Sequence, residues 1–334
     1  MDLGPSEEQV LLRDMVRRFL ADRVPASEIG KGPMAGADWQ AMGELGILSV
    51  ALPEAAGGLG GGPRDAAIVA EELGRAIAIT PFSETILGAA DLVAGCAGQH
   101  DQLGGVAAGL DLMALALGEV DEAGDRLTGS CRFVRWGAEA SAFVVVDGER
   151  AWTVAGDASG LTREPIRIAD GSIAATLSLE GCAATPLPVS GSDVSRATAM
   201  AQLGYVAELV GIMATLFDQT ADYSRQRRQF GTPIGTFQVV QHKLARMFVG
   251  LEQSRSLLLK ASLTDATAAD FNRNVTAAKA YVADAAQKAA EQSVQLHGGM
   301  GVTDELPVGR ALRRVTVLTR LFGRADEARR ALAA

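Results

Sequence analysis

Residues 227–238 read RRQFGTPIGTFQ and lie between two stretches with the periodicity of amphipathic helices. The glycines and the proline inside this segment predict a turn, because glycine adopts turn conformations at little cost and proline cannot continue a helix. We expect Arg227 to end the first helix and Thr236 to cap a second helix that begins at Phe237. Arg227 and Gln238 would then meet at one corner between two helices.

The stretches around this segment predict a bundle of four long helices over residues 191–334. Apolar residues recur at steps of three and four within 201–216, 237–258 and 311–325, and an alanine-rich stretch runs from about Phe271 to Leu296. Helices with one apolar face pack those faces together. Spare apolar surface on such a bundle commonly serves self-association or binding of a partner.

Residues 1–112 are expected to form a helical domain. Ser6 and Gln9 have the spacing of a capping box, in which each side chain satisfies a backbone amide at the start of a helix. A helix from Ser6 to about Arg23 should follow. Further helices are predicted at 38–46, 64–76 and 83–95.

Residues 113–190 show a different pattern. Asp147 and Gly148 form a hairpin turn signal between two short apolar segments. Strands are predicted at 113–119, 126–136, 141–147, 150–154 and 173–181. The predicted fold class is therefore α+β and mainly α, with an N-terminal helical domain (1–112), a small antiparallel middle β domain (113–190) and a C-terminal four-helix bundle (191–334).

Composition and charge exclude several classes of function. The net charge of −9 and the pI near 5.0 argue against a nucleic-acid binder, which needs a basic face. The three cysteines lie far apart and the three histidines are not spaced for a metal, so neither a disulfide framework nor a metal site is predicted. The N-terminus lacks the pattern of a signal peptide, and no run of about 18 uninterrupted apolar residues occurs, so we expect a cytoplasmic protein that does not enter a membrane.

A second irregular segment, QLHGGMG at 295–301, ends the alanine-rich helix. Glycines at a helix end let backbone amides approach a ligand closely. These amides, the guanidinium of Arg227 and the carboxamides of Gln238 and Gln295 suit a phosphate or pyrophosphate, each charge-assisted hydrogen bond contributing about 1.5–3 kcal/mol. We expect the two segments at opposite ends of the bundle. Turns and helix caps without a ligand would also explain them.

Three features together resemble the acyl-CoA dehydrogenase family: the helical, β, helical order, the RxxFGxxIxxFQ block at 227–238 and the QxxGGxG block at 295–301. In that family these blocks hold the adenosine and pyrophosphate half of an FAD whose flavin ring lies in the neighbouring subunit. The resemblance therefore implies FAD as the cofactor. By matching position, it implies that FAD is bound by Arg227, Gln229, Phe230, Gln238, Gln295, Gly298 and Gly299.

The family's reaction needs a carboxylate that removes the α-proton of an acyl-CoA thioester while the β-hydrogen passes to the flavin as hydride. The usual position of this base corresponds to Phe322, which falls on a predicted helix stripe and is interpreted as a core side chain. The alternative position corresponds to Ala201. Glu208, about two helical turns later, is interpreted as a solvated or interface charge. No catalytic residue is therefore assigned, and we expect the chain alone to be inactive.

The pocket for the flavin ring is also depleted relative to the family. Between strands expected to end at Leu117 and to begin near Leu127, the segment GEVDEAGDR has no hydroxyl side chain for the ring. The segment that backs the flavin appears as 133–135, FVR, and Arg324 stands where a threonine is expected. The resemblance thus retains the adenosine half of the site and loses the base, the ring pocket and the backing strand.

This combination is similar to the shortened, non-catalytic subunit of α2β2 acyl-CoA dehydrogenases that degrade steroid-derived CoA thioesters. The resemblance implies a full-length acyl-CoA dehydrogenase subunit as the partner in a heterotetramer, with an acyl-CoA substrate in that complex and an electron-transfer flavoprotein as the acceptor. Two alternatives remain open. One is an active homo-oligomer with a displaced base, and the other is a cofactor-free scaffold subunit.

Overall fold

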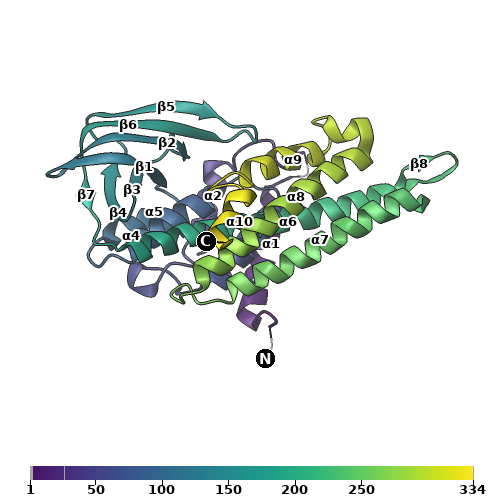
Figure 1. The fold of residues 1–334 in the computed structure, drawn as a ribbon, viewed down its shortest axis with the longest axis horizontal. Coiled ribbons are helices and arrows are strands. Elements are labelled where there is room, and N and C mark those ends of the chain that lie inside the picture. Colours follow the sequence, from purple (N-terminus) through teal and green to yellow (C-terminus); the bar gives the residue numbers. More distant parts are fainter. Residues whose placement is uncertain (1–2, 26, 334) are drawn as a thin grey trace.

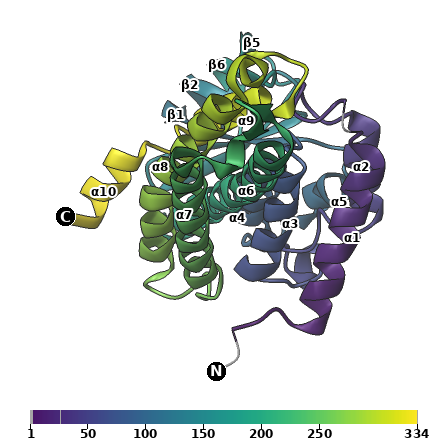
Figure 2. The same ribbon diagram turned by 90° about the vertical axis from the view of Figure 1, so that its right-hand side faces the viewer.

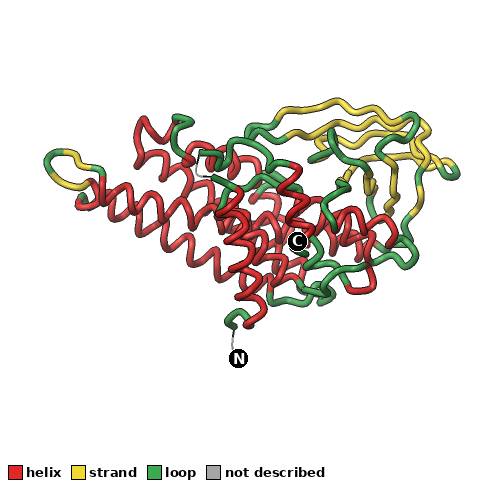
Figure 3. The backbone as a smooth tube through the Cα atoms, turned by 180° about the vertical axis from the view of Figure 1, so that it is seen from behind, coloured by secondary structure: helices red, strands yellow, loops and turns green. Residues whose placement is uncertain are grey.

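The computed structural model describes residues 3–25 and 27–333, with a sheet at one end of the long axis and a helical bundle at the other (Figure 1; Figure 3). The predicted capping box is confirmed: Ser6 Oγ accepts from Gln9 N–H at 3.2 Å, and Gln9 Oε1 accepts from Ser6 N–H at 3.1 Å. The N-terminal part is helical as predicted. Its helices are α1 (Glu7–Arg23), α2 (Gly36–Glu44), α3 (Pro63–Arg75), α4 (Asp91–Ala94) and α5 (Leu103–Ala107), with 3₁₀ turns at Glu54–Ala56 and His100–Gln102.

The helix predicted at 83–95 has an unexpected form. Residues Phe82–Ala90 make a π-helix, η2, which runs directly into α4. All nine residues of η2 are buried, so its polar residues, including Glu84, lie inside the protein. Apolar periodicity did not reveal this, because all nine residues of this short element are buried and so leave no polar face against which a wider turn could be recognised.

The middle part forms one seven-stranded sheet. Its strands, in spatial order, are β5 (Leu161–Arg167), β6 (Ile173–Ala183), β2 (Arg126–Arg135), β1 (Met113–Ala123), β3 (Ala142–Asp147), β4 (Arg150–Ala155) and β7 (Thr185–Pro186). The β5 strand was not predicted. The fold class is confirmed with one correction, since β1 and β3 run parallel and the sheet is therefore mixed.

The parallel pair arises because β1 changes partner along its length. Residues 113–117 pair with β3, and Gly118 is the first residue that pairs with β2. Alternation of apolar residues reports which face of a strand is buried, and it carries no information on the direction of the neighbouring strand. The predicted hairpin is confirmed, because Asp147 pairs with Arg150 across a turn in which Gly148 has φ 60°.

The C-terminal bundle contains α6 (Gly191–Gln226), α7 (Gln238–Ser262), α8 (Phe271–His297), α9 (Pro307–Leu318) and α10 (Ala325–Ala333). The continuous helix predicted across 311–325 is wrong. The chain turns at 319–324, where Phe322 and Gly323 have φ values of 52° and 89°. Lys279 on α8 stabilises this turn by donating a hydrogen bond to the carbonyl of Leu321, and burial lowers the pKa of Lys279 to about 8.

Helix α6 is the central helix, and α1 and α10 lie on opposite sides of the bundle around it (Figure 2). A window of α6 has a mean hydropathy of 1.5, enough for a membrane helix, but 83% of that window is buried inside the protein, as in a core helix. Gly74 on α3 and Gly211 on α6 allow close packing. A Cβ at either position would overlap a backbone carbonyl of the other helix.

Candidate functional site

The segment that opened the sequence analysis forms the far tip of the bundle (Figure 1). Arg227 is the C-cap of α6, and a short hairpin of β8 (Arg228–Gln229) and β9 (Thr232–Pro233) follows it. The predicted cap at Thr236 is wrong, because Thr236 ends a 3₁₀ turn, η4 (Ile234–Thr236), and its hydroxyl donates to the carbonyl of Pro233 at 2.7 Å. Helix α7 therefore starts at Gln238, without a side-chain cap.

Most side chains of this tip are exposed. Phe230 is 94% exposed and has φ 52°, a left-handed conformation that is rare for an aromatic residue. Arg227, Gln229 and Gln238 are also exposed. The side chains of Arg227 and Gln238 make no hydrogen bond to any residue within 3–25 or 27–333. An exposed aromatic ring and unpaired donors together are typical of a surface that contacts another molecule.

The second predicted segment lies at the same end of the bundle. The rings of Tyr223 on α6 and His297 on α8 stack with centroids 4.3 Å apart, which joins the C-terminal ends of these two helices. The expectation that the two segments lie at opposite ends is wrong. Helix α7 runs back along the bundle, so α6 and α8 point the same way and their C-terminal ends lie together. Gln295, Gly298 and Gly299 are exposed beside this contact. The structure therefore brings both predicted segments to one end.

A separate cavity of about 370 Å³ lies between the sheet and the helices. Its walls come from β1, β2, η2, α6, α9 and the 319–324 turn. Phe322 lines this cavity and is half-buried, with its ring 5.7 Å from that of Tyr205. Phe322 packs against the hydrophobic core, as expected of a core side chain, but it lies in a turn and the predicted helix around it is wrong; it cannot accept a proton. Ala201, at the alternative base position, is fully buried.

The cavity and the bundle tip are far apart within this chain. Tyr205 lines the cavity and Arg227 caps the same helix, 22 residues later. At about 1.5 Å per residue, this separation is about 33 Å along the helix axis. An extended dinucleotide is shorter than this. A dinucleotide bound at the tip therefore cannot reach the cavity of the same chain.

Three buried polar groups line the cavity at its inner end: Glu84 from η2, Arg135 from β2 and Tyr205 from α6. Arg135 Nε donates to Glu84 Oε1 at 3.0 Å. Glu84 Oε2, Arg135 Nη2 and Tyr205 Oη are buried without a hydrogen-bond partner among the described residues. Burial, followed by the nearby charge of Glu84, raises the pKa of Tyr205 well above its ordinary value, so its hydroxyl stays protonated.

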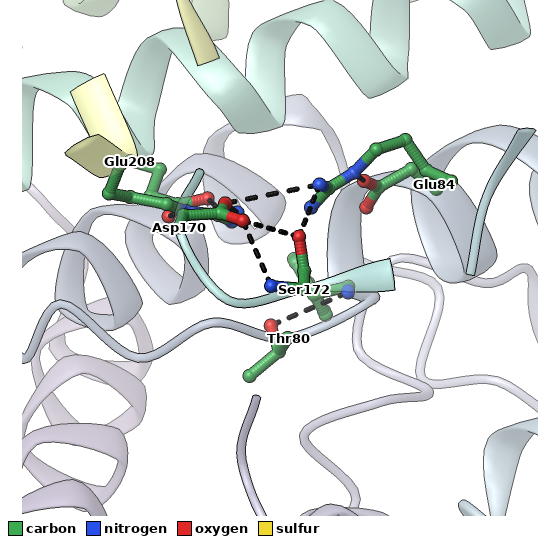
Figure 4. Close-up of polar contacts among 8 residues, drawn as sticks. Thr80, Glu84, Asp170, Ser172 and Glu208 are labelled. Atoms are coloured by element: carbon green, nitrogen blue, oxygen red, sulfur yellow. Dashed lines mark hydrogen bonds and ion pairs between the residues drawn. The ribbon is translucent and has the colours of Figure 1, made fainter. Parts of the chain in front are cut away.

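Arg135 also connects the cavity to a buried ion network, which Figure 4 shows running from Glu84 through Ser172 to Asp170 and Glu208. At its centre, Arg314 of α9 donates to both oxygens of Glu208, at 2.6 and 3.0 Å, and to Asp170 at 2.8 Å. Glu208 is 5% exposed, so its interpretation as a solvated or interface charge is wrong. Because Arg314 occupies both carboxylate oxygens, Glu208 is not placed to remove a proton from a substrate.

The electrostatics of this network follow from burial and pairing. Burial raises the pKa of Glu208, and Arg314 opposes that shift. Burial has the same effect on Asp170, but there Arg314 and Arg135 outweigh it and lower the pKa of its carboxyl. Asp170 comes from the loop between β5 and β6, so the network joins the sheet to α6 and α9.

Sequence reasoning missed Glu84, Arg135, Asp170 and Arg314. A signal existed for Arg314, since it lies three residues after Ala311 and therefore on the apolar face of its helix. The same holds for Glu208, three residues after Tyr205. No comparable signal marked Glu84, because all nine residues of η2 are buried and the element has no exposed face to set it apart.

Three segments were expected to lack the family's contacts to the flavin ring: 118–126, 133–135 and Arg324. GEVDEAGDR is not a loop, because β1 continues to Ala123 and β2 starts at Arg126, so a tight hairpin stands there. Phe133 and Arg135 both line the cavity, Phe133 with φ 56° and Arg135 turned toward Glu84. Arg324, the last residue of the 319–324 turn, is exposed.

The residues of the bundle tip fit one half of an FAD. Unpaired donors on Arg227, Gln238 and Gln295, with open space around Gly298 and Gly299, suit a pyrophosphate. Neither position expected for a catalytic base carries a carboxylate.

Comparison with protein families gives two matches along the chain. The model of the acyl-CoA dehydrogenase N-terminal domain matches residues 6–102, and that of the acyl-CoA dehydrogenase C-terminal domain matches residues 192–334. Acyl-CoA dehydrogenase IpdE2 of Mycobacterium tuberculosis is 30% identical over 91% of this chain and 89% of its own length. Its namesake from Mycolicibacterium smegmatis is 28% identical over 98% of this chain and 99% of its own length.

Solved structures agree with these matches. A variant of the Tcur3481-Tcur3483 steroid ACAD superposes with a TM-score of 0.90 at 28% identity, covering 99% of this chain and 98% of its own. The ChsE4-ChsE5 complex from Mycobacterium tuberculosis has a TM-score of 0.90 at 25% identity, covering 100% and 98%. The structural similarity to both proteins covers the sheet and the helical bundle of this chain.

Proposed function

The chain belongs to the acyl-CoA dehydrogenase family, whose members are FAD-dependent oxidoreductases acting on CH–CH bonds, and we propose that it is the partner subunit of a heteromeric enzyme. In this role it supplies the adenosine and pyrophosphate half of the FAD site to a full-length subunit. The base comes from that partner. The chain alone is inactive.

The observation that carries this proposal is the bundle tip. The side chains of Arg227 and Gln238 have no hydrogen-bond partner among the described residues, Phe230 is 94% exposed, and the cavity of the same chain is about 33 Å away along the helix. A second chain is needed to place a flavin ring against this tip. The lack of a carboxylate at Phe322 and Ala201 supports the further step that this chain does not supply the base.

The residues of the tip have separate tasks in this proposal. Arg227 donates to a phosphate oxygen, and the backbone amides at Gly298 and Gly299 approach the pyrophosphate closely because no Cβ stands in the way. Gln229, Gln238 and Gln295 donate or accept through their carboxamides, and Phe230 covers the adenosine. When bound, FAD supplies the acceptor for the hydride.

Similarity to related proteins extends the proposal to the substrate, the partners and the location. Relatives include a steroid ACAD and the two-component ChsE4-ChsE5 complex, which supports a heterotetramer acting on a bulky, steroid-derived acyl-CoA. An electron-transfer flavoprotein takes the electrons, and the complex works in the cytoplasm. We also propose domain boundaries near residues 112 and 190, at the two ends of the sheet.

Coexpression with a full-length acyl-CoA dehydrogenase subunit encoded beside this chain tests the proposal, with bound FAD counted per purified complex. Arg227→Ala should lower the FAD content because a charge-assisted hydrogen bond contributes about 1.5–3 kcal/mol, which corresponds to at least about tenfold in affinity. Arg225→Ala is the matched control, since Arg225 is exposed two residues earlier and pairs with Asp222 at 2.5 Å. An FAD content indifferent to Arg227→Ala would favour a cofactor-free scaffold.

One observation favours the alternative of an active homo-oligomer enough to test it. Glu84 places a carboxylate oxygen without a partner in the cavity, although it does so from η2 and not from either usual base position. The purified chain alone is therefore assayed with acyl-CoA substrates and an artificial electron acceptor. A yellow protein that reduces the acceptor would replace the partner-subunit proposal.

A further inference from the structure

A groove in the helical bundle runs between α7 and α8, which lie side by side (Figure 1; Figure 2). Its volume is about 660 Å³, and its walls come from α7, α8 and α10. None of the residues assigned to FAD lines it. Because α7 and α8 run antiparallel, the start of α7 faces the end of α8, and Gly250 faces Ala285 midway along the groove. The groove is therefore distinct from the cavity beside the sheet and from the dinucleotide surface at the tip.

One end of the groove is positively charged. Lys243 and Arg246 from α7 and Lys288 from α8 line it. None of these three side chains has a hydrogen bond or an ion pair with any residue within 3–25 or 27–333. Beside them, Gln292 Oε1 is buried and has no hydrogen-bond partner in the described part of the chain. In a chain with a net charge of −9, this end still lacks both an anion and a hydrogen-bond donor.

The middle of the groove is formed by apolar and small side chains: Met247, Val249, Ala285 and Ala289. Met247 and Ala289 are buried and form its floor. Gly250 leaves space between the two helices, because the nearest atom to a Cβ at this position would be 3.9 Å away. A linear apolar chain placed here would leave water, which is favourable.

The other end of the groove is crossed by side chains that bond to one another. The hydroxyl of Tyr281 donates to Gln253 between α8 and α7, and Arg329 of α10 pairs with Asp284 at 2.8 Å. These bridges interrupt the groove, whereas a partner helix, about 10–12 Å across, needs a groove that is open along its length. The volume of about 660 Å³ falls in the range of small-molecule sites, about 300–1,000 Å³. The groove is therefore better suited to a small molecule than to a helix.

We propose that this groove binds a single-chain anionic amphiphile, with a phosphate head between Lys243, Arg246 and Lys288 and an alkyl tail along the apolar middle. A phosphate monoester carries a charge of about −1.5 to −2 at pH 7 and three acceptor oxygens, so it matches three cations better than a singly charged carboxylate. A hydroxyl group beside the phosphate donates to Gln292 Oε1. The inference does not rest on the proposed function, because binding in the groove needs neither FAD nor a partner subunit.

Isothermal titration calorimetry on the full purified chain tests the proposal, with octyl phosphate as the probe below its micelle concentration. Octyl phosphate should bind at least about tenfold more tightly than inorganic phosphate, which lacks the tail. It should also bind at least about tenfold more tightly than octyltrimethylammonium, whose head has the opposite charge. Equal affinity for the two octyl compounds would overturn the proposal, since binding would then depend on the tail alone. Failure of octyl phosphate to bind would overturn it as well.

Variants at the charged end locate the head of the ligand. Lys288→Ala removes an exposed side chain from a helix, so the fold should persist while the affinity for octyl phosphate falls about tenfold. Lys260→Ala is the matched control, because Lys260 is an exposed lysine on α7 that does not line the groove, and it should leave the affinity unchanged. Wild type should prefer 2-hydroxyoctyl phosphate to octyl phosphate, and Gln292→Leu should abolish that preference. Equal effects of Lys288→Ala and Lys260→Ala would show that the phosphate binds elsewhere.

Two other occupants of the groove would also overturn the proposal. Competition by ADP against octyl phosphate would show that the three cations belong to the dinucleotide surface at the tip. A second copy of the chain would be the occupant if sedimentation showed an oligomer that does not bind octyl phosphate and that Val249→Asp dissociates, since Val249 lines the groove and is 52% exposed. The count of FAD per complex uses none of these ligands, so the partner-subunit proposal stands or fails separately.

Discussion

Removing Arg314 should destabilise the protein more than any other single change to its charged residues. Its guanidinium lies inside the protein, 1% exposed, and pairs with Glu208 from α6 and Asp170 from the loop between β5 and β6. Arg314→Met keeps the length and the packing of the side chain but leaves two buried carboxylates without their main partner. The sheet, α6 and α9 would thus lose the contact that joins them.

The expected size of the effect follows from these partners. Breaking a buried ion pair by removing one member costs about 3–5 kcal/mol. Asp170 keeps hydrogen bonds from the backbone and hydroxyl of Ser172, so its own loss is partial and the single-pair range applies. With an unfolding entropy of about 2.1 cal/mol/K per residue over 334 residues, this range corresponds to a fall in melting temperature of about 4–7 °C.

Urea unfolding followed by tryptophan fluorescence, together with thermal melting, would measure this effect at pH 7. Arg313→Met is the matched control, because Arg313 is the neighbouring arginine on α9, is 43% exposed, and pairs at 2.9 Å with Asp304, which is 77% exposed. The control should cost at most about 1 kcal/mol. If both variants lost the same small amount of stability, the network would not hold the sheet to the bundle.

The effect of Arg314→Met should also depend on pH. In the variant, Glu208 is buried without its paired cation, whereas Asp170 keeps Arg135 at 3.9 Å. Burial then raises the pKa of Glu208 further, so the folded state binds a proton more readily than the unfolded state. A raised pKa stabilises the fold at low pH, so the deficit of the variant should shrink as the pH falls from 7 toward 5. A deficit independent of pH would indicate lost packing in place of lost pairing.

Three further predictions concern the fold. Gly211→Ala should lower the free energy of unfolding in urea by about 1–3 kcal/mol, because its Cβ would overlap the carbonyl of Glu71. Gly250→Ala, whose nearest neighbour is a methyl group at 3.9 Å, should raise the free energy of unfolding by about 0.5–1 kcal/mol. Similar effects of the two variants would refute close packing at Gly211. Burial raises the pKa of Asp91 to about 6, so its stabilisation is present below about pH 4 and is lost as the pH rises through 6. Wild type should therefore lose up to about 3 kcal/mol relative to Asp91→Asn across this window, and parallel urea midpoints would contradict it. Ser6→Ala should cost about 1 kcal/mol by removing the cap of α1, and an unchanged unfolding midpoint would show that this cap does not stabilise the fold.

The sequence by itself determined the order of the chain and the chemistry of the bundle tip. Apolar spacing located most helices and strands, because burial of one face imposes a period of 3.6 or 2 on the residues. The capping box at Ser6 and the hairpin turn at Gly148 are local, so a few adjacent residues suffice to predict them. The segments 227–238 and 295–301 indicated the family for the same reason, since their glycines and polar residues act within short stretches.

Only the tertiary structure decided which residues from distant segments meet. Local periodicity did not encode the parallel pairing of β1 with β3, the position of the segments 227–238 and 295–301 at one end of the bundle, or the π-helical form of η2. The sequence indicated a surface charge at Glu208, whereas in the structure Glu208 pairs with Arg314, 106 residues later. Burial of a charge is decided by long-range packing, and the position of Glu84 in the wall of the cavity depends on that packing as well.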